Sequence, residues 1–414
     1  MDPRPYILLA TQMASASPIP ATPSHGITTL DLNRTPFRHR ARLLLAVFFV
    51  AFLLLLFAGT WLHWDPIESR ENRNMAIAPG WPHTFEDAKT FSQRFMVFYR
   101  DHFGFRNSLI RGVAMGEFHG GLGPEINNRI IVGKEGWLFY SKDEKYLADR
   151  GLDPYSDADL TAWQELLEKR RKWFTDHGYP FLVVIPPDKQ TIYPEFLPDR
   201  FAKPPTPSRL DQLVSRLRQT HSPVQIIDLR PALWEAKRHR QIYFKTDSHW
   251  NDYGAYTAYR VILDAIQQAL PSRKLTPQTL AQFVTVSATH SGDLAQDLDL
   301  YFEYHEQTTL LVRGDLYANP DRLKTLFAHT YTDGPDRHAP RLLMYNDSFA
   351  ASLMQFFAPN FSRAFYAWNA WTSTVNPAPT IEQKPDVVIN EFVERKLYEP
   401  VPVDSDEIRD EKLR

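Results

Sequence analysis

The chain has 414 residues, a formal net charge of -2 and a hydrophobic fraction of 43%, which suffices for one large domain or two ordinary ones with a packed core. The near-neutral charge argues against a nucleic-acid-binding protein, which would carry an excess of Lys and Arg on at least one face. The sequence contains no cysteine, and this excludes thiolate metal sites, iron–sulfur clusters, disulfides and thiol nucleophiles.

The N-terminal segment predicts a membrane anchor. Residues 1–37 are rich in Pro, Ser, Thr and Ala, and we expect a disordered cytoplasmic tail there. A basic cluster at 38–42 precedes the uncharged residues 43–62, which are long enough to cross about 30 Å of hydrocarbon as a helix. Because basic flanks mark the cytoplasmic side, we expect 38–64 to be a single-pass anchor with the rest of the chain outside. A cleaved signal peptide, whose apolar core is usually shorter, is the alternative.

The remainder predicts an α/β domain. Residues 65–130 are expected to form a helical connector, with a helical stripe of aromatic residues between 91 and 99. Over 131–400, strands are expected at 181–185, 224–228, 342–345, 364–368 and 387–390, with helices at 160–174, 210–217, 256–266 and 351–357. This alternation predicts a mostly parallel sheet with helices on both faces. Residues 271–340 give only a turn at 291–294 and a short strand at 310–312, and 401–414 read as a loose tail.

Two short stretches carry candidate chemistry. Asp247 stands two residues before His249, and Ser348 follows an apolar strand at a turn into a helix, which is how a nucleophile is presented at a sheet edge. A histidine can take the serine proton near neutral pH, and an aspartate can hold the imidazole in the right tautomer. Asp247, His249 and Ser348 are therefore candidates for a catalytic triad.

Each half of this pattern is weak by itself. An Asp-x-His pair is often a hydrogen-bonded loop, and an Asp before a Ser at a strand end is an ordinary helix cap. A metal site made of Asp247, His249, Asp293 and His305 is a competitor. Since the spacing of these four residues follows no tight metal motif, we expect neither a metal nor another cofactor.

Further candidates follow strand ends, where ligands of parallel sheets bind. An oxyanion needs donors aimed at it; the amide of Ser348 is one candidate and the side chain of Asn390 is a second. Lys189 and Tyr193 are candidates for contact with the substrate. A structural role for either residue is equally open.

A series of motifs in fixed order resembles a known family. The motifs stand at 71–73, 101–106, 133–140, 187–195, 247–250, 292–294, 347–349 and 386–395. The chain is similar to the AlgJ/AlgX-type alginate O-acetyltransferases, which have an SGNH hydrolase-like domain. The resemblance implies a three-layer α/β/α domain, and triad roles for Asp247, His249 and Ser348.

The resemblance also implies a function. It suggests a periplasmic enzyme, anchored in the bacterial inner membrane, that acetylates hydroxyls of an alginate-like exopolysaccharide through an acetyl-serine. The expected partners are the polysaccharide acceptor, a multipass membrane acyltransferase as acetyl donor and the exopolysaccharide synthesis complex. A carbohydrate acetylesterase and a non-catalytic polysaccharide-assembly factor are the alternatives.

Two departures from the family pattern matter. Asn346-Asp347 precedes the serine, where the family often has Gly-Asp or His-Asp, and this change should leave the nucleophile intact. The chain ends soon after the expected catalytic domain, so we expect the AlgJ-type arrangement without the carbohydrate-binding module of the AlgX type.

Overall fold

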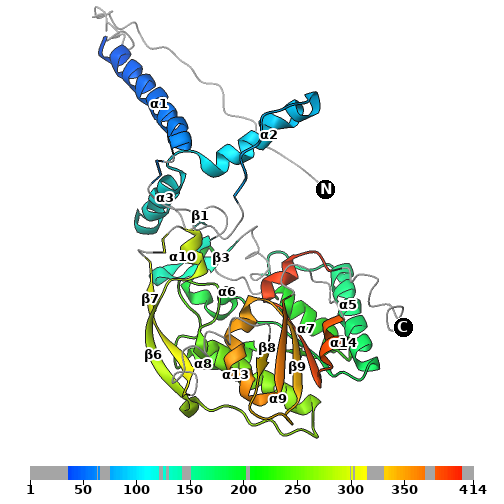
Figure 1. The fold of residues 1–414 in the computed structure, drawn as a ribbon. Coiled ribbons are helices and arrows are strands. Elements are labelled where there is room, and N and C mark those ends of the chain that lie inside the picture. The colour runs from blue at the N-terminus through cyan, green and yellow to red at the C-terminus, as the bar shows by residue number, and fades with distance from the viewer. Residues whose placement is uncertain are drawn as a thin grey trace, which may run out of the picture.

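The fold is taken from a computed structural model. It describes residues 36–62, 64–65, 75–120, 125–126, 130–141, 151–201, 206–298, 300–301, 304–314, 331–368 and 378–402. The tail expected at 1–37 lies almost entirely outside the described residues, as do the motif at 71–73 and most of 401–414. Figure 1 shows an α/β body from which α1 and α2 project.

A six-stranded sheet, in the order β5-β4-β11-β9-β10-β8, forms the centre of the body. All neighbouring strands are parallel except β8, which pairs antiparallel with β10. The strands are β4 (Phe181–Val184), β5 (Ile226–Ile227), β8 (Tyr331–Asp333), β9 (Arg341–Asn346), β10 (Arg363–Trp368) and β11 (Val387–Glu391). The predicted mostly parallel sheet is confirmed, and its last strand, β11, lies between β4 and β9.

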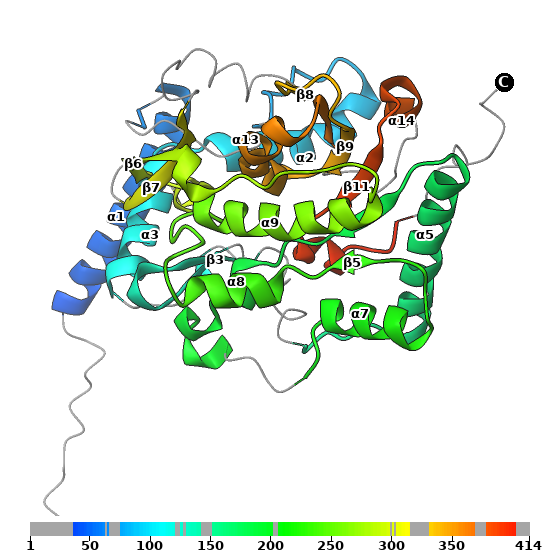
Figure 2. The ribbon, with the colours of Figure 1, turned by 90° about the horizontal axis from the view of Figure 1, so that it is seen from below.

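Both faces of this sheet are covered, as expected for parallel strands. Leu182, Met344 and Ile389 face α9 (Asp252–Ala269) and α13 (Met354–Phe357) in one hydrophobic cluster. Alternate residues of the same strands, such as Val183, face α5 (Asp157–Asp176) and α7 (Arg209–Gln219) in a second cluster. Figure 2 shows α9 and α7 on opposite sides of the strands. The domain is therefore a three-layer α/β/α sandwich.

Local sequence signals set the helix ends. Ser156 and Asp159 form a capping box at the start of α5, and Ser208 with Asp211 does the same for α7. Each pair satisfies backbone N–H groups that have no partner within the helix. After α5 the chain turns through Gly178, whose φ of 83° suits the left-handed position that ends a helix.

Two smaller sheets accompany the central one. One has three strands: β1 (Glu125–Ile126), β2 (Ile130–Val132) and β3 (Leu138–Tyr140). Residues 271–340, where the sequence predicted only a turn and one short strand, contain a long hairpin of β6 (Phe283–His290) and β7 (Glu306–Arg313). The expected turn at 291–294 leads into α10 (Asp293–Asp297).

The other helical segments are short, apart from three at the N-terminal end. These three are α1 (Pro36–Leu62), α2 (Phe85–His102) and α3 (Arg106–Gly120). The short ones are η1 (Lys134–Gly136), α6 (Lys189–Ile192), η3 (Pro194–Phe196), η4 (Asp199–Phe201), α8 (Arg230–Lys237), η5 (Leu280–Gln282), η6 (Ser348–Leu353), η7 (Ala358–Asn360), α14 (Ala378–Gln383) and η8 (Glu394–Tyr398). Among the described residues, one helix is long and apolar enough to cross a membrane by length and composition, at Arg40–Leu62.

A buried lysine ties the central sheet to the loop before α9. Lys189, just after β4, is 1% exposed, and its ammonium donates to the carbonyl oxygens of Phe244, Lys245 and Asp247 at 2.6 to 3.0 Å. Burial lowers its pKa to about 8, although the nearby carboxylates of Asp247, Asp293 and Glu306 oppose the shift. All three bonds go to the backbone, so the geometry supports the structural role for Lys189.

Tyr193 is held in a similar way. It is 5% exposed, its ring lies 4.5 Å from that of Trp137, and its hydroxyl oxygen accepts the N–H of Ile242 at 3.0 Å. Burial raises its pKa to about 12. Tyr193 therefore packs inside the domain instead of presenting its hydroxyl to a substrate.

We predict that Lys189→Met lowers the free energy of unfolding by roughly 2–4 kcal/mol, because three buried carbonyl groups lose their donor. Urea unfolding of the full chain in detergent micelles measures this. Lys172→Met is the matched control: it removes an exposed ion pair with Asp176, and its effect should stay within about 0.5 kcal/mol. Equal midpoints for the two variants would show that the Lys189 contacts contribute nothing.

Candidate active site

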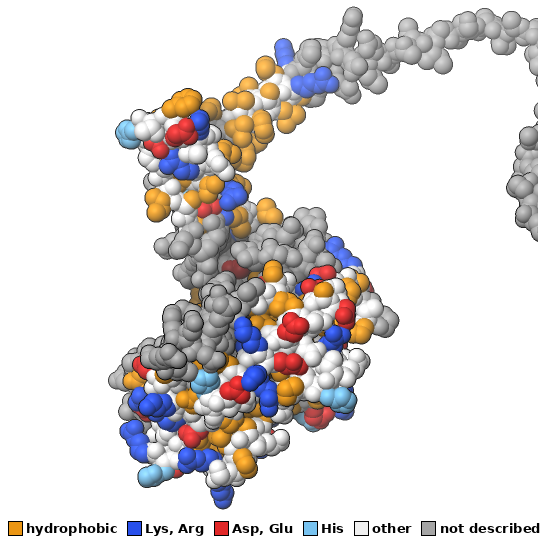
Figure 3. Space-filling view, turned by 90° about the vertical axis from the view of Figure 1, so that its right-hand side faces the viewer, with side chains coloured by type: hydrophobic (Ala, Val, Ile, Leu, Met, Phe, Trp, Pro, Cys, Tyr) orange, Lys and Arg blue, Asp and Glu red, His pale blue; other side chains and the backbone are white. Residues whose placement is uncertain are grey.

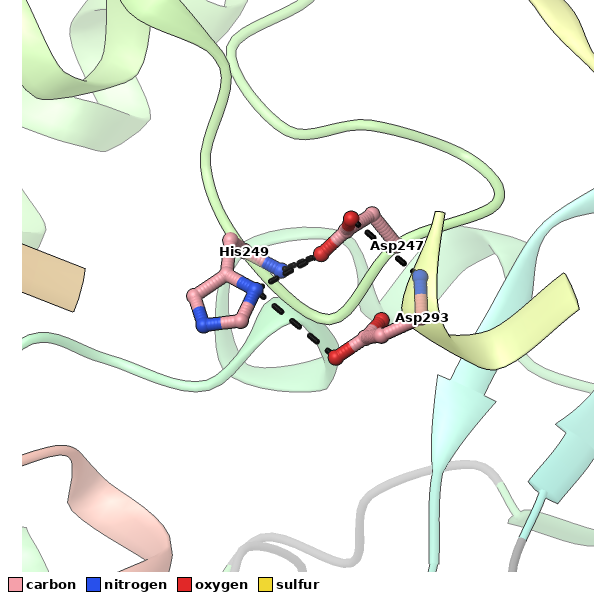
Figure 4. Close-up of side chains that lie close together, drawn as sticks. All are labelled: Asp247, His249 and Asp293. Carbon is pink, nitrogen blue, oxygen red and sulfur yellow. Dashed lines mark hydrogen bonds and ion pairs between the residues drawn. The ribbon is translucent and has the colours of Figure 1, made fainter. Parts of the chain in front are cut away.

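Asp247, His249 and Ser348 form one hydrogen-bonded chain. Nδ1 of His249 lies 2.7 Å from Oδ1 of Asp247, and Nε2 of the same ring lies 2.7 Å from Oγ of Ser348. With the proton on Nδ1, the ring donates to the carboxylate and accepts from the serine hydroxyl. Figure 4 shows the imidazole turned toward the carboxylate of Asp247.

Ser348 is presented by the turn from β9 into η6. The carboxylate of Asp347 accepts the N–H groups of Phe349 and Val393 at 2.9 and 2.8 Å, while Glu391 accepts the N–H of Asp347 at 2.8 Å. Asp347 thus caps the helical turn, as Asp does at helix starts, and also ties it to the end of β11. The serine follows this doubly anchored residue.

The hairpin holds the loop that carries Asp247. His290 and Glu306 are cross-strand partners at its last register position. Nε2 of His290 lies 3.1 Å from Oδ2 of Asp247, and Oε1 of Glu306 accepts both the N–H and the hydroxyl of Thr246 at 2.9 Å. The facing side chains of His290 and Glu306 therefore hold two consecutive residues of the loop by hydrogen bonds.

Gly292 brings the chain after the hairpin strand into direct contact with the same loop. A Cβ atom at this position would lie 2.3 Å from Cβ of Asp247 and 2.4 Å from its Cα, so only glycine fits. The close approach places Asp293 beside the triad: its carboxylate accepts the N–H of Ser248 at 2.7 Å and the Ser248 hydroxyl at 2.6 Å.

The electrostatics favour an ionised aspartate beside a basic imidazole. Burial alone would raise the pKa of Asp247, but hydrogen bonds from His249 and His290 outweigh it and lower that pKa well below its usual range. Burial alone would lower the pKa of His249, but the hydrogen bond and charge of Asp247, with the charge of Asp293, raise it above its ordinary value. The pKa of Asp293 is raised by burial and by Asp247.

Three of the four residues considered as metal ligands lie close together. Donor atoms of Asp247, His249 and Asp293 lie within 4.8 Å of one another, whereas His305 does not belong to this group. A cation there would have to displace the Nδ1–H bond between His249 and Asp247, and Asp293 already accepts from Ser248. The hydrogen bonds account for the cluster.

Asn390 does not join the triad. Its side-chain oxygen accepts from Nη1 of Arg170 at 3.0 Å, and the two residues line a small cavity of about 40 Å³ with Trp163 of α5. The ring of Phe349, which lies 4.7 Å from that of His249, belongs to the cluster on the other, α9 side. The geometry therefore gives no support to Asn390 as an oxyanion donor.

Arg395 is the residue near the nucleophile to which the sequence assigned no role. Its guanidinium lies 5.4 Å from the centre of the Phe349 ring and 5.0 Å from that of Tyr140. Nη1 donates to the buried carboxylate of Asp188 at 2.6 Å, and the side chain is 15% exposed. The positive charge of Arg395 also acts on His249, where it opposes the rise of the imidazole pKa. Both Asp188 and Arg395 stand in motifs that carry the family resemblance.

Comparisons with known proteins bear on the domain that contains this site. Residues 130–331 match the model of the family described as "SGNH hydrolase-like domain, acetyltransferase AlgX"; this range includes Asp247 and His249 but ends before Ser348.

Among curated proteins, the chain is similar to two named "Probable alginate O-acetylase AlgJ". The Pseudomonas putida protein is 26% identical over 172 residues, which cover 41% of this chain and 42% of the relative. The Pseudomonas syringae pv. tomato protein is 27% identical over 228 residues, or 50% and 55%. These matches thus cover about half or less of each relative's length.

Among solved structures, the O-acetyltransferase domain of Pseudomonas putida AlgJ is 19% identical, with a TM-score of 0.42 over 68% of this chain and 96% of that chain. The family model, the motif series and the sheet agree with one another: residues 130–331 are similar to the SGNH hydrolase-like domain of the AlgX family, and the chain is similar to AlgJ proteins.

Proposed function

We propose that this protein is a membrane-anchored O-acetyltransferase that transfers acetyl groups to hydroxyls of an alginate-like exopolysaccharide through Ser348. The observation that carries the proposal is the unbroken hydrogen-bond chain from Asp247 through His249 to Ser348. Its similarity to AlgJ proteins supports acetylation of an exopolysaccharide.

The chemistry takes two steps. Oγ of Ser348 attacks the carbonyl carbon of the acetyl donor, and its proton passes to Nε2 of His249, which then protonates the leaving group. A sugar hydroxyl next gives its proton to His249 and attacks the acetyl-serine. Ser348 leaves and takes the proton back. Transfer and hydrolysis differ only in the acceptor, so a well-oriented sugar must compete with water by effective concentration.

The negative charge that develops on the acetyl oxygen needs donors. The amide of Ser348, in the first turn of a helical segment, has no acceptor within that turn. We assign the second contribution to Arg395 instead of Asn390, because its guanidinium lies against the ring of Phe349 next to the nucleophile. Its ion pair with Asp188 fixes the orientation of the charge.

The proposed setting follows from the N-terminal helix. With Arg40–Leu62 crossing the inner membrane and the basic flank in the cytoplasm, residues 131–400 would act in the periplasm as the catalytic domain, joined by the connector at 65–130. A multipass membrane acyltransferase would supply the acetyl groups there, within an exopolysaccharide synthesis complex.

Ser348→Ala should reduce the acetyl content of the secreted polysaccharide to below about a tenth of the parent level, because removal of a triad nucleophile costs orders of magnitude in rate. Acetyl analysis of polymer from complemented cells measures this. Ser215→Ala, on the exposed surface of α7, is the control and should acetylate normally.

Unchanged acetylation by the Ser348 variant would instead favour the non-catalytic assembly factor. With the purified chain and a chromogenic acetyl ester, acetylated oligosaccharide formed at the expense of free acetate separates transfer from the acetylesterase activity.

The pH profile tests the charge of Asp293. Because His249 must be neutral to accept a proton and its pKa is raised, kcat/KM should fall on the acid side with a midpoint above the ordinary imidazole value of about 6.5. In Asp293→Asn one negative charge that raises this pKa is gone, so the midpoint should move to lower pH. Asp264→Asn, on the exposed side of α9, should leave it in place. A midpoint unmoved by Asp293→Asn would contradict the electrostatic account.

Arg395→Lys tests whether the planar guanidinium is needed or whether a positive charge alone suffices. Lysine can keep an ion pair with Asp188, but it presents a compact charge without the flat donor group. We expect kcat to fall by about 10–100-fold, with an unchanged unfolding midpoint. A kcat within twofold of the parent, in a folded variant, would assign Arg395 a purely structural role.

A further inference from the structure

The helix that follows the anchor has a continuous aromatic face. Along α2 the side chains of Ala88, Phe91, Phe95 and Tyr99 recur on one side. Trp81 stacks on Phe91 at 5.9 Å, and the ladder continues from Phe91 to Phe95 and from Phe95 to Tyr99 at 6.1 Å each.

This part of the protein exposes large apolar side chains to an unusual degree. Trp81 is 81% exposed, Phe85 78% and Met96 62%. Within the part of the chain that the structure describes, contact with the central sheet does not account for the ladder, because α2 projects away from the body (Figure 1). Exposed apolar surface of this extent marks an interaction site.

The far end of the ladder is fixed to α1. The ring of Tyr99 lies 6.5 Å from that of Phe57, and the N–H of Gly104 donates to Oγ1 of Thr60 at 2.9 Å. A Cβ atom on Gly104 would lie 2.4 Å from the carbonyl oxygen of Leu56 and 2.7 Å from Cα of Gly59. The corner between α2 and α3 is therefore seated on the last turns of the candidate membrane span.

That seating sets the depth of α2. Arg40–Leu62 is the candidate span, so contacts at residues 56 to 60 lie within its last two turns, close to the end that approaches the polar headgroups. From this level α2 runs sideways, away from the axis of α1 (Figure 1). Figure 3 shows hydrophobic side chains crowded on α1, and a mixture of hydrophobic and charged side chains on the adjoining projection.

The remaining surface of α2 suits the membrane–water boundary better than a buried protein interface. The remaining surface carries polar and charged side chains of both signs, namely Glu86, Asp87, Lys89, Gln93, Arg94 and Arg100. The long side chains of Lys89, Arg94 and Arg100 can reach lipid phosphates. Trp and Tyr rings are the residues that prefer the headgroup level.

We propose that α2 is an interfacial helix that lies in the outer headgroup region of the same bilayer that α1 spans, with its aromatic face toward the acyl chains. This inference rests on the anchor in the proposed function, but not on the acetyl chemistry. Its occupant is a lipid surface, so it makes a second contact between the chain and the membrane.

The absence of cysteine from the sequence allows single-cysteine nitroxide labelling of the full chain in lipid nanodiscs that contain phosphatidylglycerol. Ala88→Cys reports the aromatic face and Gln93→Cys the polar face; both positions are exposed, so neither change disturbs packing. Val50→Cys in α1 is the bilayer control, and His239→Cys on the catalytic domain is the aqueous control.

We expect the label at Ala88 to be accessible to oxygen and protected from a water-soluble nickel chelate, as at Val50, while Gln93 behaves like His239. A nickel-accessible Ala88 together with a protected Val50 would overturn the inference alone and leave the face to a protein partner. A nickel-accessible Val50 would overturn the anchor and the inference together. Ser348→Ala tests the acetyl chemistry separately.

Discussion

The geometry of the site depends on one buried ammonium group. The loop between α8 and α9 has little regular structure of its own, and its backbone carbonyls converge on Nζ of Lys189, which follows β4 in the sheet. The rings of Trp137 and Phe139 lie 5.7 and 5.4 Å from the same nitrogen. A charge buried in this way is tolerated only when it is fully hydrogen-bonded. Lys189 thus fixes the position of Asp247 relative to the central strands. Because His249 is hydrogen-bonded to Asp247, its position is fixed as well.

The other half of the site is held by carboxyl groups at the carboxyl end of the sheet. Burial, followed by the charge of Asp347, raises the pKa of Glu391 well above its usual range, and burial with the charge of Asp188 raises the pKa of Glu394 to about 7. Both shifts favour the neutral, protonated form of these acids. Several acidic side chains can therefore lie together at the carboxyl end of the sheet without full mutual repulsion. Asp188 holds the guanidinium of Arg395 in place.

Local patterns in the sequence predicted the layers of the fold well. Buried parallel strands are runs of apolar residues, and capping residues mark the ends of helices. The hairpin β6–β7 escaped prediction since most of its side chains are exposed or half-buried on both faces. Chain order also gave no sign that β11 would enter between β4 and β9. For the same reason Asn390 was placed near the serine: a strand end was evident, but which face its side chain takes depends on neighbours that only the fold supplies.

Packing also connects the N-terminal helix with the site. Asp65, just beyond α1, accepts the N–H groups of Asn107 and Ser108 at the start of α3. Met115 of the same helix packs against a cluster that contains Leu294 of α10, the helix that begins with Asp293. Each step of this connection is a hydrogen bond or a hydrophobic contact. The described parts of the connector therefore act as a strut between α1 and the site.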